Sequence, residues 1–342
     1  FAGGFDGLDI TESDPSRNTR LDDSNDSDPD KNNYAYHTIK RAIDSLKDPE
    51  MLEFNIATMP GVTNTKLTKE LIDNCEERGD ALAIIDLDNT DRSVYQPAAE
   101  STQSEKNRVN DQNIDTVVTN LDSREINSSY ACTYYPWVQV RDENTEAILK
   151  VPPSVAALGT MSFSQAQQAL WFAPAGFTRG GLSNGIAGLD VVGVTHKLTS
   201  RDRDKLYEAN INPIASFPAE GLVVFGQKTL QVTPSALDRI NVRRLLIFLK
   251  KEVSRIAATT LFEQNVRSTW LGFSSRVKSF LSGVKSQVGL VDYKVVLDET
   301  TTTPEMIDRN IMYAKIFIKP ARAIEFIALD FIITDSGASF ED

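Results

Sequence analysis

Two apolar runs separated by a helical pattern place the strongest constraint on how this chain folds. The first run, MLEFNIATMPG at residues 51–61, ends in a Pro-Gly turn, and the second, DALAIIDLD at residues 80–88, is apolar up to its acidic end. Between them, Leu67 and Leu71 recur at helical spacing within residues 63–79. Two buried strands joined by one helix pair in parallel through a right-handed crossover. The sequence therefore predicts an α/β body with a partly parallel sheet.

The last third of the chain has a different pattern. Residues 241–257 and 268–287 each carry apolar side chains along one helical face. Residues 293–298 and 310–320 have the composition of strands. We therefore expect an α+β C-terminal domain in which a helix pair packs on antiparallel strands, followed by an extended terminal β-arm at about residues 324–342.

The length of the chain, 342 residues, is sufficient for two hydrophobic cores. We place a first domain at residues 1–203 and a second at residues 204–342. One segment of the first domain, at about residues 9–33, has too few apolar side chains to offset the entropy of ordering it, and we expect a solvated loop there. Residues at about 98–128 are also polar, and we expect a solvated loop there or, as the alternative, a helix at the surface. Because Phe1 is followed by Ala-Gly-Gly and not by a signal-peptide pattern, we expect a fragment of a longer protein.

Local patterns predict four further elements. Apolar residues at helical spacing after Tyr34 predict a helix that ends before Pro49. The aromatic and β-branched segment at residues 130–140 predicts one strand. Pro and Gly residues indicate turns around a short helix near residues 164–170, and residues 222–225 form a short apolar strand.

Composition excludes several classes of function. The net charge of −12 argues against nucleic-acid binding over the whole surface. The richest apolar run, residues 245–249, is far shorter than the roughly 20 residues that cross a bilayer, so we expect no membrane insertion. Cys75 and Cys132 are distant in sequence and predict buried free thiols in a reducing cytoplasm.

The acidic end of the second strand is the one candidate for catalysis. Asp86 and Asp88 stand in the pattern D-x-D-x-T, which resembles the start of a haloacid-dehalogenase-like phosphatase site. In such a site one carboxylate attacks phosphorus and both lie beside Mg²⁺. That chemistry also needs a later Lys and a further acidic motif on parallel strands, and no strand after residue 90 ends in paired acids. We therefore interpret both residues as acids that cap a strand and keep the phosphatase as the alternative.

Other reactive residue types do not form recognisable sites. His37 and His196 lack neighbours at metal-ligand spacing, and Gly3-Gly4-Phe5-Asp6-Gly7 lacks the strand and helix that flank a phosphate-binding loop. The sequence predicts no cofactor, no metal site and no enzymatic activity.

A series of short motifs runs along the chain in a fixed order. They are GGFDG at 3–7, ERGDALAIID at 77–86, YPWV at 135–138, VPPS at 151–154, WFAPAG at 171–176, NINPI at 210–214, VFGQKTL at 224–230 and INVRRL at 240–245. Together they resemble the conserved C-terminal part of contractile bacteriophage tail sheath proteins. Phe225 and Gln227-Lys228 depart from the Trp and Ala-Arg usual in that family.

The resemblance implies a structural protein of the virion that acts through contacts with copies of itself. Such a subunit polymerises as stacked hexameric rings around a tail tube, in the host cytoplasm, and contracts to drive the tube through the host envelope. Its implied partners are the tail tube, baseplate and tail terminator proteins. A sheath of a related secretion machine or bacteriocin has the same sequence pattern.

Three basic residues are candidates for contact with the tube. Lys278 and Lys285 lie seven residues apart and so on nearly one side of their helix, with Arg276 on the other flank of the apolar stripe. The resemblance implies that a helix of the C-terminal domain meets the tube, and cations facing an acidic tube would give a salt-sensitive contact. We expect Ser268–Gln287 to be this helix.

Two further regions are candidates for contacts between subunits. Arg243 and Arg244 are adjacent, so both should not point into the core of one amphipathic helix, and we expect them to pair with carboxylates of another subunit or domain. In the terminal arm, an apolar run would aggregate as a bare edge strand. The resemblance implies that it joins a neighbour's sheet. Its candidate residues are Ile324, Phe326, Leu329, Phe331 and Ile333.

Overall fold

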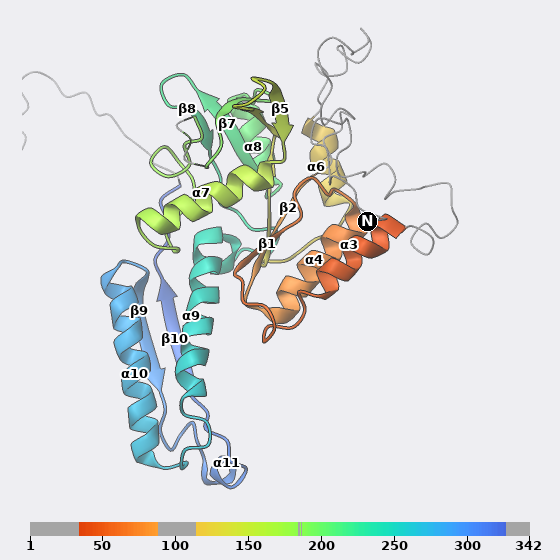
Figure 1. The fold of residues 1–342 in the computed structure, drawn as a ribbon. Coiled ribbons are helices and arrows are strands. Elements are labelled where there is room, and N and C mark those ends of the chain that lie inside the picture. The colour runs from red at the N-terminus through yellow and green to blue at the C-terminus, as the bar shows by residue number, and fades with distance from the viewer. Residues whose placement is uncertain (1–33, 88–113, 184, 186, 326–342) are drawn as a thin grey trace, which may run out of the picture.

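The computed structural model describes residues 34–87, 114–183, 185 and 187–325 (Figure 1). A body of sheets and helices occupies one end of the molecule, and a long helix pair with a small sheet extends from it. The expected loop at 9–33 and residues 326–342 of the expected arm lie outside the described residues.

A five-stranded sheet forms the centre of the body, in the order β1-β2-β3-β7-β8. Its strands are β1 (Ile56–Thr58), β2 (Leu82–Ile85), β3 (Ala131–Tyr135), β7 (Asn212–Phe217) and β8 (Gly221–Val224). The first four run parallel, and β8 returns antiparallel to β7. The predicted parallel pair is confirmed in β1 and β2. Since β7 hydrogen-bonds to β3, this sheet extends across the expected domain boundary at residues 203 and 204.

Helix α4 (Thr65–Arg78) is the predicted crossover between β1 and β2. The Asn64 side chain accepts hydrogen bonds from the backbone N–H groups of Lys66 and Leu67, which satisfies donors at the start of the helix. The helix ends at Gly79, whose φ of 64° lies in the left-handed region that glycine adopts without steric cost. Both helix ends are thus specified locally.

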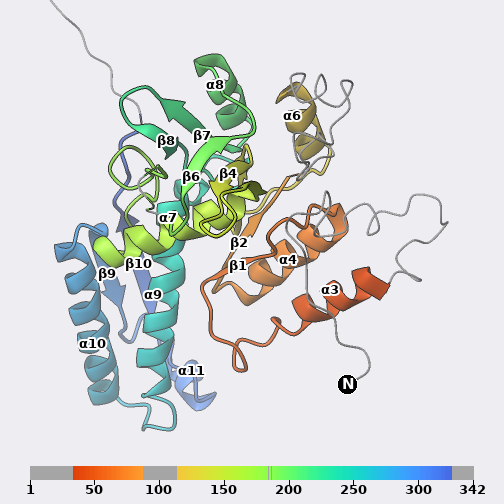
Figure 2. The ribbon, with the colours of Figure 1, turned by 45° about the horizontal axis from the view of Figure 1, so that its top comes forward.

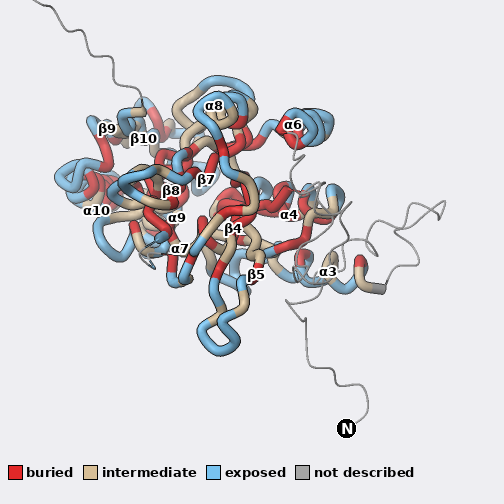
Figure 3. Tube along the Cα trace, turned by 90° about the horizontal axis from the view of Figure 1, so that it is seen from above, coloured by how far each residue is buried: buried red, intermediate tan, exposed pale blue. Residues whose placement is uncertain are grey.

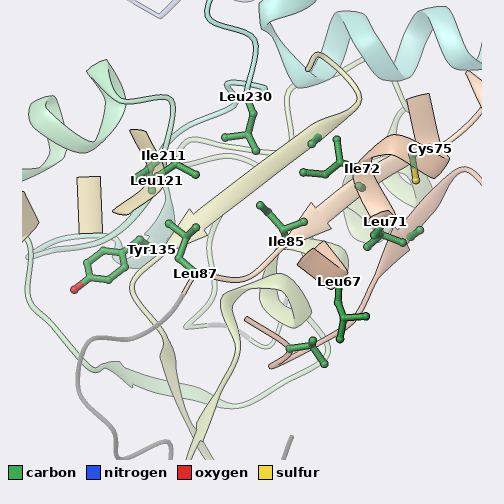
Figure 4. Packing of buried hydrophobic residues seen from close by; sticks show 14 of the residues in the cluster. Leu67, Leu71, Ile72, Cys75, Ile85, Leu87, Leu121, Tyr135, Ile211 and Leu230 are labelled. Atoms are coloured by element: carbon green, nitrogen blue, oxygen red, sulfur yellow. The ribbon is translucent and has the colours of Figure 1, made fainter. Parts of the chain in front are cut away.

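Helices cover both faces of the five-stranded sheet (Figure 2). On one face lie α3 (Tyr34–Asp44), α4, α6 (Ile114–Asp122) and α8 (Ser200–Glu208), whose apolar side chains form one core with alternate residues of the sheet (Figure 4). On the other face α7 (Pro153–Gln167) and the start of α9 (Ile240–Ala258) pack in a second core. Buried residues concentrate in the strands of this body, whereas the helices turn exposed faces outward (Figure 3).

A second, three-stranded sheet has the order β5-β4-β6 and lies beside α7. It consists of β4 (Val138–Arg141), β5 (Ile148–Val151) and β6 (Val191–Val194). The prediction of one strand over 130–140 is wrong, because the chain leaves β3 at a cis Tyr135–Pro136 bond and enters this other sheet as β4. Pro136 has no N–H with which to continue a ladder.

The C-terminal part contains the predicted helix pair, α9 (Ile240–Ala258) and α10 (Arg267–Ser286). A two-stranded antiparallel sheet of β9 (Leu290–Val296) and β10 (Lys315–Pro320) packs against it. Two short helical segments, η1 (Ala236–Asp238) and α11 (Pro304–Asp308), precede α9 and β10. The predicted helix pair on antiparallel strands is present.

The structure changes the position of two predicted elements. The expected loop at 98–128 is wrong for residues 114–122, where the alternative of a helix is present as α6, because Ile114, Val117 and Leu121 are buried against the sheet although their neighbours are polar. Residues 98–113 of that loop lie outside the described part of the chain. The helix expected near 164–170 starts at Pro153, which occupies the first helical position where its missing N–H costs nothing.

Candidate functional site: assembly surfaces

Asp86 is fully buried and cross-links two elements of the body. Its carboxylate accepts hydrogen bonds from the Gly61 N–H (2.9 Å), the Ser154 N–H (3.1 Å) and the Ser154 hydroxyl (2.7 Å). Burial raises the pKa of Asp86 to about 6, although these three donors favour the charged form. A carboxylate enclosed by such partners ties the turn after β1 to the start of α7 and has no access to a phosphate ester.

Asp88, the other acid of the phosphatase alternative, lies outside the described residues. Among the residues that the structure does describe, no group of three or more His, Cys, Asp and Glu side chains is placed to hold a metal ion. Cys75 and Cys132 are buried free thiols, as predicted. In the described ranges no helix is long and apolar enough to cross a bilayer.

Helix α10 buries the apolar face that the sequence predicts and exposes its basic side chains. Arg276 turns back to α9, where its guanidinium donates to the hydroxyls of Thr259 (2.6 Å) and Thr260 (2.9 Å). Lys285 pairs with Asp292 of β9 at 2.9 Å. Lys278 is exposed and has no ion pair with any described residue. The three predicted cations thus differ in availability, and Lys278 is the most available.

Arg243 and Arg244 are both buried, with exposures of 6% and 4%, so the expectation that they could not both be buried is wrong. The physical reason is that the first half of α9 packs into two cores: Ile240 and Ile247 into that of the body, and Leu245 and Leu249 into that of the C-terminal part, so more than one side of the helix is covered (Figure 1). Arg243 lies over the ring of Tyr130 at 3.9 Å and donates to the Ser129 hydroxyl. Arg244 donates to the Gln165 side chain at 2.9 Å.

The last described residues are fixed to the body by Glu325. Its carboxylate accepts hydrogen bonds from Arg239 Nε (2.6 Å), Gln227 Nε2 (3.1 Å) and the Tyr207 hydroxyl (3.0 Å). Its neighbour Ile324 is 83% exposed. The other candidate arm residues, Phe326, Leu329, Phe331 and Ile333, lie outside the described residues.

Sequence reasoning missed this anchor. The available signal was an acid inside an otherwise apolar run, because a charged side chain in that position requires a partner. Gln227, one of the departures from the family pattern, is one partner of Glu325. The other departing residues lie nearby: Lys228 lies 4.4 Å from the centre of the Tyr207 ring, and Phe225 stacks on Phe217 at 5.0 Å.

Beside this anchor lies a cleft of about 750 Å³. Segments from across the chain line it, including Trp171, Phe225, Asn241 and the last described residues 321–325. The last described residues therefore form one wall of this cleft.

The two-stranded sheet is open at both sides. Strand β9 pairs with β10 alone among the described strands, and β10 pairs with β9 alone. In β9 only Leu290 and Val295 are buried, and in β10 exposed and half-buried side chains alternate. Val291 and Phe317 are 52% and 57% exposed. Helices α9 and α10 cover one face of this sheet, but unpaired strand edges are where a further strand can add.

Comparison with known proteins relates the chain to one class. Residues 232–334 match the family model of the phage tail sheath C-terminal domain. The chain is 35% identical over 222 residues to the tail sheath protein of Vibrio phage KVP40 and 35% identical over 217 residues to that of Enterobacteria phage T4, covering 65% and 64% of this chain. It is 30% identical over 272 residues to the tail sheath protein of Salmonella phage ViI, covering 78% of this chain.

The chain spans about a third of the length of these relatives, with 32% of the first two and 41% of the third covered. The relatives are structural tail sheath proteins and not enzymes, in agreement with the prediction of a non-enzyme.

Solved structures show the same fold. A chain in the baseplate structure of the anti-feeding prophage matches with a TM-score of 0.64 and 21% identity, covering 89% of this chain and 74% of that chain. The contracted sheath complex of the extracellular contractile injection system PVC also matches with a TM-score of 0.64, at 22% identity, covering 85% and 74%. With this shared fold, the chain is a relative of phage tail sheath proteins, and its residues 232–334 belong to the phage tail sheath C-terminal domain family.

Proposed function

We propose that this chain is part of the structural subunit of a contractile tail sheath. In this proposal it polymerises as stacked hexameric rings around a tail tube, and the rings contract to drive the tube through a host envelope. The observation that carries the proposal is its kinship to the tail sheath proteins of three phages over about two thirds or more of its length. The baseplate, tail terminator and tube proteins are the proposed partners, and a virion tail assembled in the host cytoplasm is the proposed location.

The open two-stranded sheet and the Glu325 anchor support a role for the terminal segment as a joint. Since Glu325 holds the chain to the body, the segment that follows has a fixed starting point. Residues 326–334 are rich in apolar side chains, and strands β9 and β10 have unpaired edges in the described chain. We propose that this segment adds a strand to the β9–β10 sheet of another copy, so that main-chain hydrogen bonds connect subunits while they rotate.

We further propose α10 as the helix that faces the tube, with Lys278 as its principal cation. Lys278 is exposed without an ion pair to a described residue, whereas Lys285 and Arg276 have partners within the chain. If Lys285 left its ion pair with Asp292 and paired with a carboxylate of the tube, it would join the same contact. Polar contacts of this kind break without exposing a large apolar surface.

The division into residues 1–203 and 204–342 remains part of the proposal. Strands β7 and β8 lie after residue 203 but complete the sheet of the first unit. The elements α9, α10, β9 and β10 build a further core, to which Trp171 of the first unit also contributes. In this proposal the α/β unit is the scaffold of the lattice, and the C-terminal unit makes the contacts with the tube and with neighbouring subunits.

Negative-stain electron microscopy of the purified chain, alone and mixed with tail tubes, tests the function. We expect striated tubes with a regular ring repeat. Particles that stay monomeric with and without tubes would count against the proposal. A sheath of a contractile injection system is the second candidate, favoured by the fold shared with the PVC sheath complex, and the two differ in whether the assembled sheath is attached to a capsid.

A further inference from the structure

The turn between α9 and α10 presents an apolar projection at the end of the helix pair that is far from the body (Figure 1). Phe262 is fully exposed, and its neighbour Leu261 is 67% exposed. The φ of Phe262 is 67°, a left-handed conformation that bulky residues rarely adopt. An uncommon backbone conformation that displays an aromatic ring to water indicates a surface that binds a partner.

Hydrogen bonds hold this turn in place. Trp270 Nε1 donates to Asn265 Oδ1 at 2.7 Å, and Asn265 Nδ2 donates to the Ile311 carbonyl at 3.3 Å. The turn is thereby tied both to α10 and to the segment that precedes β10. Leu261 and Phe262, the knob, are therefore presented by an ordered turn, which limits the entropy lost when they bind.

The cleft beside the Glu325 anchor can bury such a knob. Its volume of about 750 Å³ exceeds that of a phenylalanine side chain. Trp171, which is buried, and Phe172, which is half-buried, lie in its walls. Phe225, also a wall residue, is 40% exposed and lies 5.7 Å from the ring of Phe177. An aromatic side chain that enters the cleft would therefore be buried among other rings.

Charge also matches the knob to the cleft. Glu263, next to the knob, is exposed and has no ion pair with a described residue. Three arginines and two acids line the cleft: Arg179, Arg203, Arg322, Asp204 and Glu325. None of these arginines has an ion pair within the described ranges, whereas Glu325 is already paired with Arg239. The cleft thus carries an excess of positive charge, which suits the acid beside the knob.

The knob and the cleft of one copy lie at opposite ends of the helix pair. Asn241, in the first turn of α9, lines the cleft, whereas Leu261 follows the end of that helix. Because an α-helix rises about 1.5 Å per residue, the nineteen residues of α9 place the two about 28 Å apart. We propose that the knob of one copy of this chain binds in the cleft of another, with Glu263 facing the arginines of that cleft.

Such a contact joins two different surfaces, so each added copy offers a new knob and a new cleft. Contacts of this kind repeat into closed rings or into helices. The inference deepens the proposed sheath function and rests on it for the identity of the partner. It uses other residues than the strand addition by the terminal segment, so the two contacts can be tested separately.

Disulfide cross-linking between two single-substitution chains tests the contact. Leu261→Cys places a thiol in the knob and leaves Phe262 intact, and Ala323→Cys places one in the exposed wall of the cleft. The two native cysteines are buried. With an added oxidant, this mixture should form a cross-linked dimer about tenfold faster than a mixture of Ala323→Cys with Ile148→Cys, because only a specific contact raises the effective concentration of the thiols. Ile148 is an exposed position on β5 outside the cleft.

Two further changes in the Leu261→Cys chain should slow the cross-link. Phe262→Asn removes the ring and keeps a residue that adopts left-handed φ readily, so the thermal midpoint should not fall while the rate drops roughly tenfold. Glu263→Lys should lower the rate by roughly threefold at low salt and less at high salt. A rate equal to that of the Ile148→Cys control, or one that Phe262→Asn leaves unchanged, would overturn the contact.

Electron microscopy of the same samples separates this inference from the sheath proposal. Tubes that form without the cross-link between knob and cleft would leave the sheath proposal intact and overturn the contact. A cross-link that forms in a chain without tubes would support the contact and count against the sheath.

Discussion

The five-stranded sheet and the two-stranded sheet of this chain differ in how completely the chain itself covers them. Strands β2 and β3 are buried along their whole length, with helices on both faces of the sheet. Strands β9 and β10 have one pairing partner each among the described residues and expose side chains such as Phe317. The first sheet is therefore covered by the described chain itself, whereas the second keeps unpaired strand edges and exposed apolar side chains, where the proposed strand addition would act.

Removal of residues 331–342 should have the largest effect, and that effect should fall on assembly and not on stability. If the terminal segment supplies a strand to another copy, polymerisation should be abolished, and the thermal midpoint of the dispersed chain should stay within about 2 °C because the described cores remain. Sedimentation and electron microscopy measure the first quantity and calorimetry the second. A truncated chain that still forms full-length sheaths would refute the role of the segment.

Truncation of one side chain in each sheet should separate stability from assembly. Ile84 in β2 is fully buried, and Ile84→Ala should lower the free energy of unfolding by about 3 kcal/mol. Phe317 in β10 is 57% exposed, and Phe317→Ala should cost less than about 1 kcal/mol in the dispersed chain while it reduces polymerisation. Urea unfolding and pelleting assays give the two readouts. Equal losses of stability would show that the β9–β10 sheet is as complete as the central one.

The buried acid of the body predicts a pH dependence. Burial raises the pKa of Asp86 to about 6, above the value of about 3.9 for an unfolded aspartate. The folded state therefore binds the proton more tightly, and the stability that Asp86 contributes is fully present below about pH 3.9 and is lost as the pH rises through about 6. From about pH 4 to about pH 7, the free energy of unfolding of the wild type should fall by on the order of 2 kcal/mol relative to Asp86→Asn.

Asp292 on β9 is the matched control for this experiment. It is exposed, and its hydrogen bond with Lys285 lowers its pKa, so its contribution is present above the unfolded pKa and lost as the pH falls. Relative to Asp292→Asn, the wild type should change little and in the opposite direction. An Asp86 difference that stays flat with pH would contradict the assignment of Asp86 as a buried, desolvated acid.

The smallest effect is expected on the basic side of α10. Reversal of the exposed charge in Lys278→Glu should weaken binding of the sheath to tail tubes by roughly tenfold at low salt and less at high salt, because exposed charges are screened. Lys285→Glu, which also loses the Asp292 pair, should add to the loss in the double variant. Unchanged sheath–tube assembly by the double variant at every salt concentration would show that α10 does not face the tube.

Local periodicity predicted those parts of the fold that local sequence specifies. The bounds of α9 and α10 lie within one residue of the prediction, because each helix buries a continuous apolar face. Helix α6 was only an alternative to a loop, because its three buried apolar residues stand in polar surroundings and the sheet that they cover is not visible in the local sequence. The pairing of β3 with β7 joins residues nearly eighty positions apart, and no local pattern contains that information.

The candidate surfaces were less predictable than the fold. The helical periodicity of α9 placed Arg243 and Arg244 outside the core, but this reasoning assumes one buried face, and the start of α9 is covered on several. Glu325 lies in the segment that the sequence assigned to an arm, and its partner Arg239 lies two residues before the predicted helix at 241–257. Their contact follows from the path of the chain after β10, which sequence patterns do not determine.

The Glu325 anchor also determines where a mechanical load enters the molecule. A pull on the chain beyond residue 325 acts first on the contact with Arg239, the residue that immediately precedes α9. From there the load divides between a nineteen-residue helix that is packed between the body and α10 and the chain that leads back to β10. The force that one terminal segment can transmit is therefore set by the packing of α9 together with the hydrogen bonds between β9 and β10.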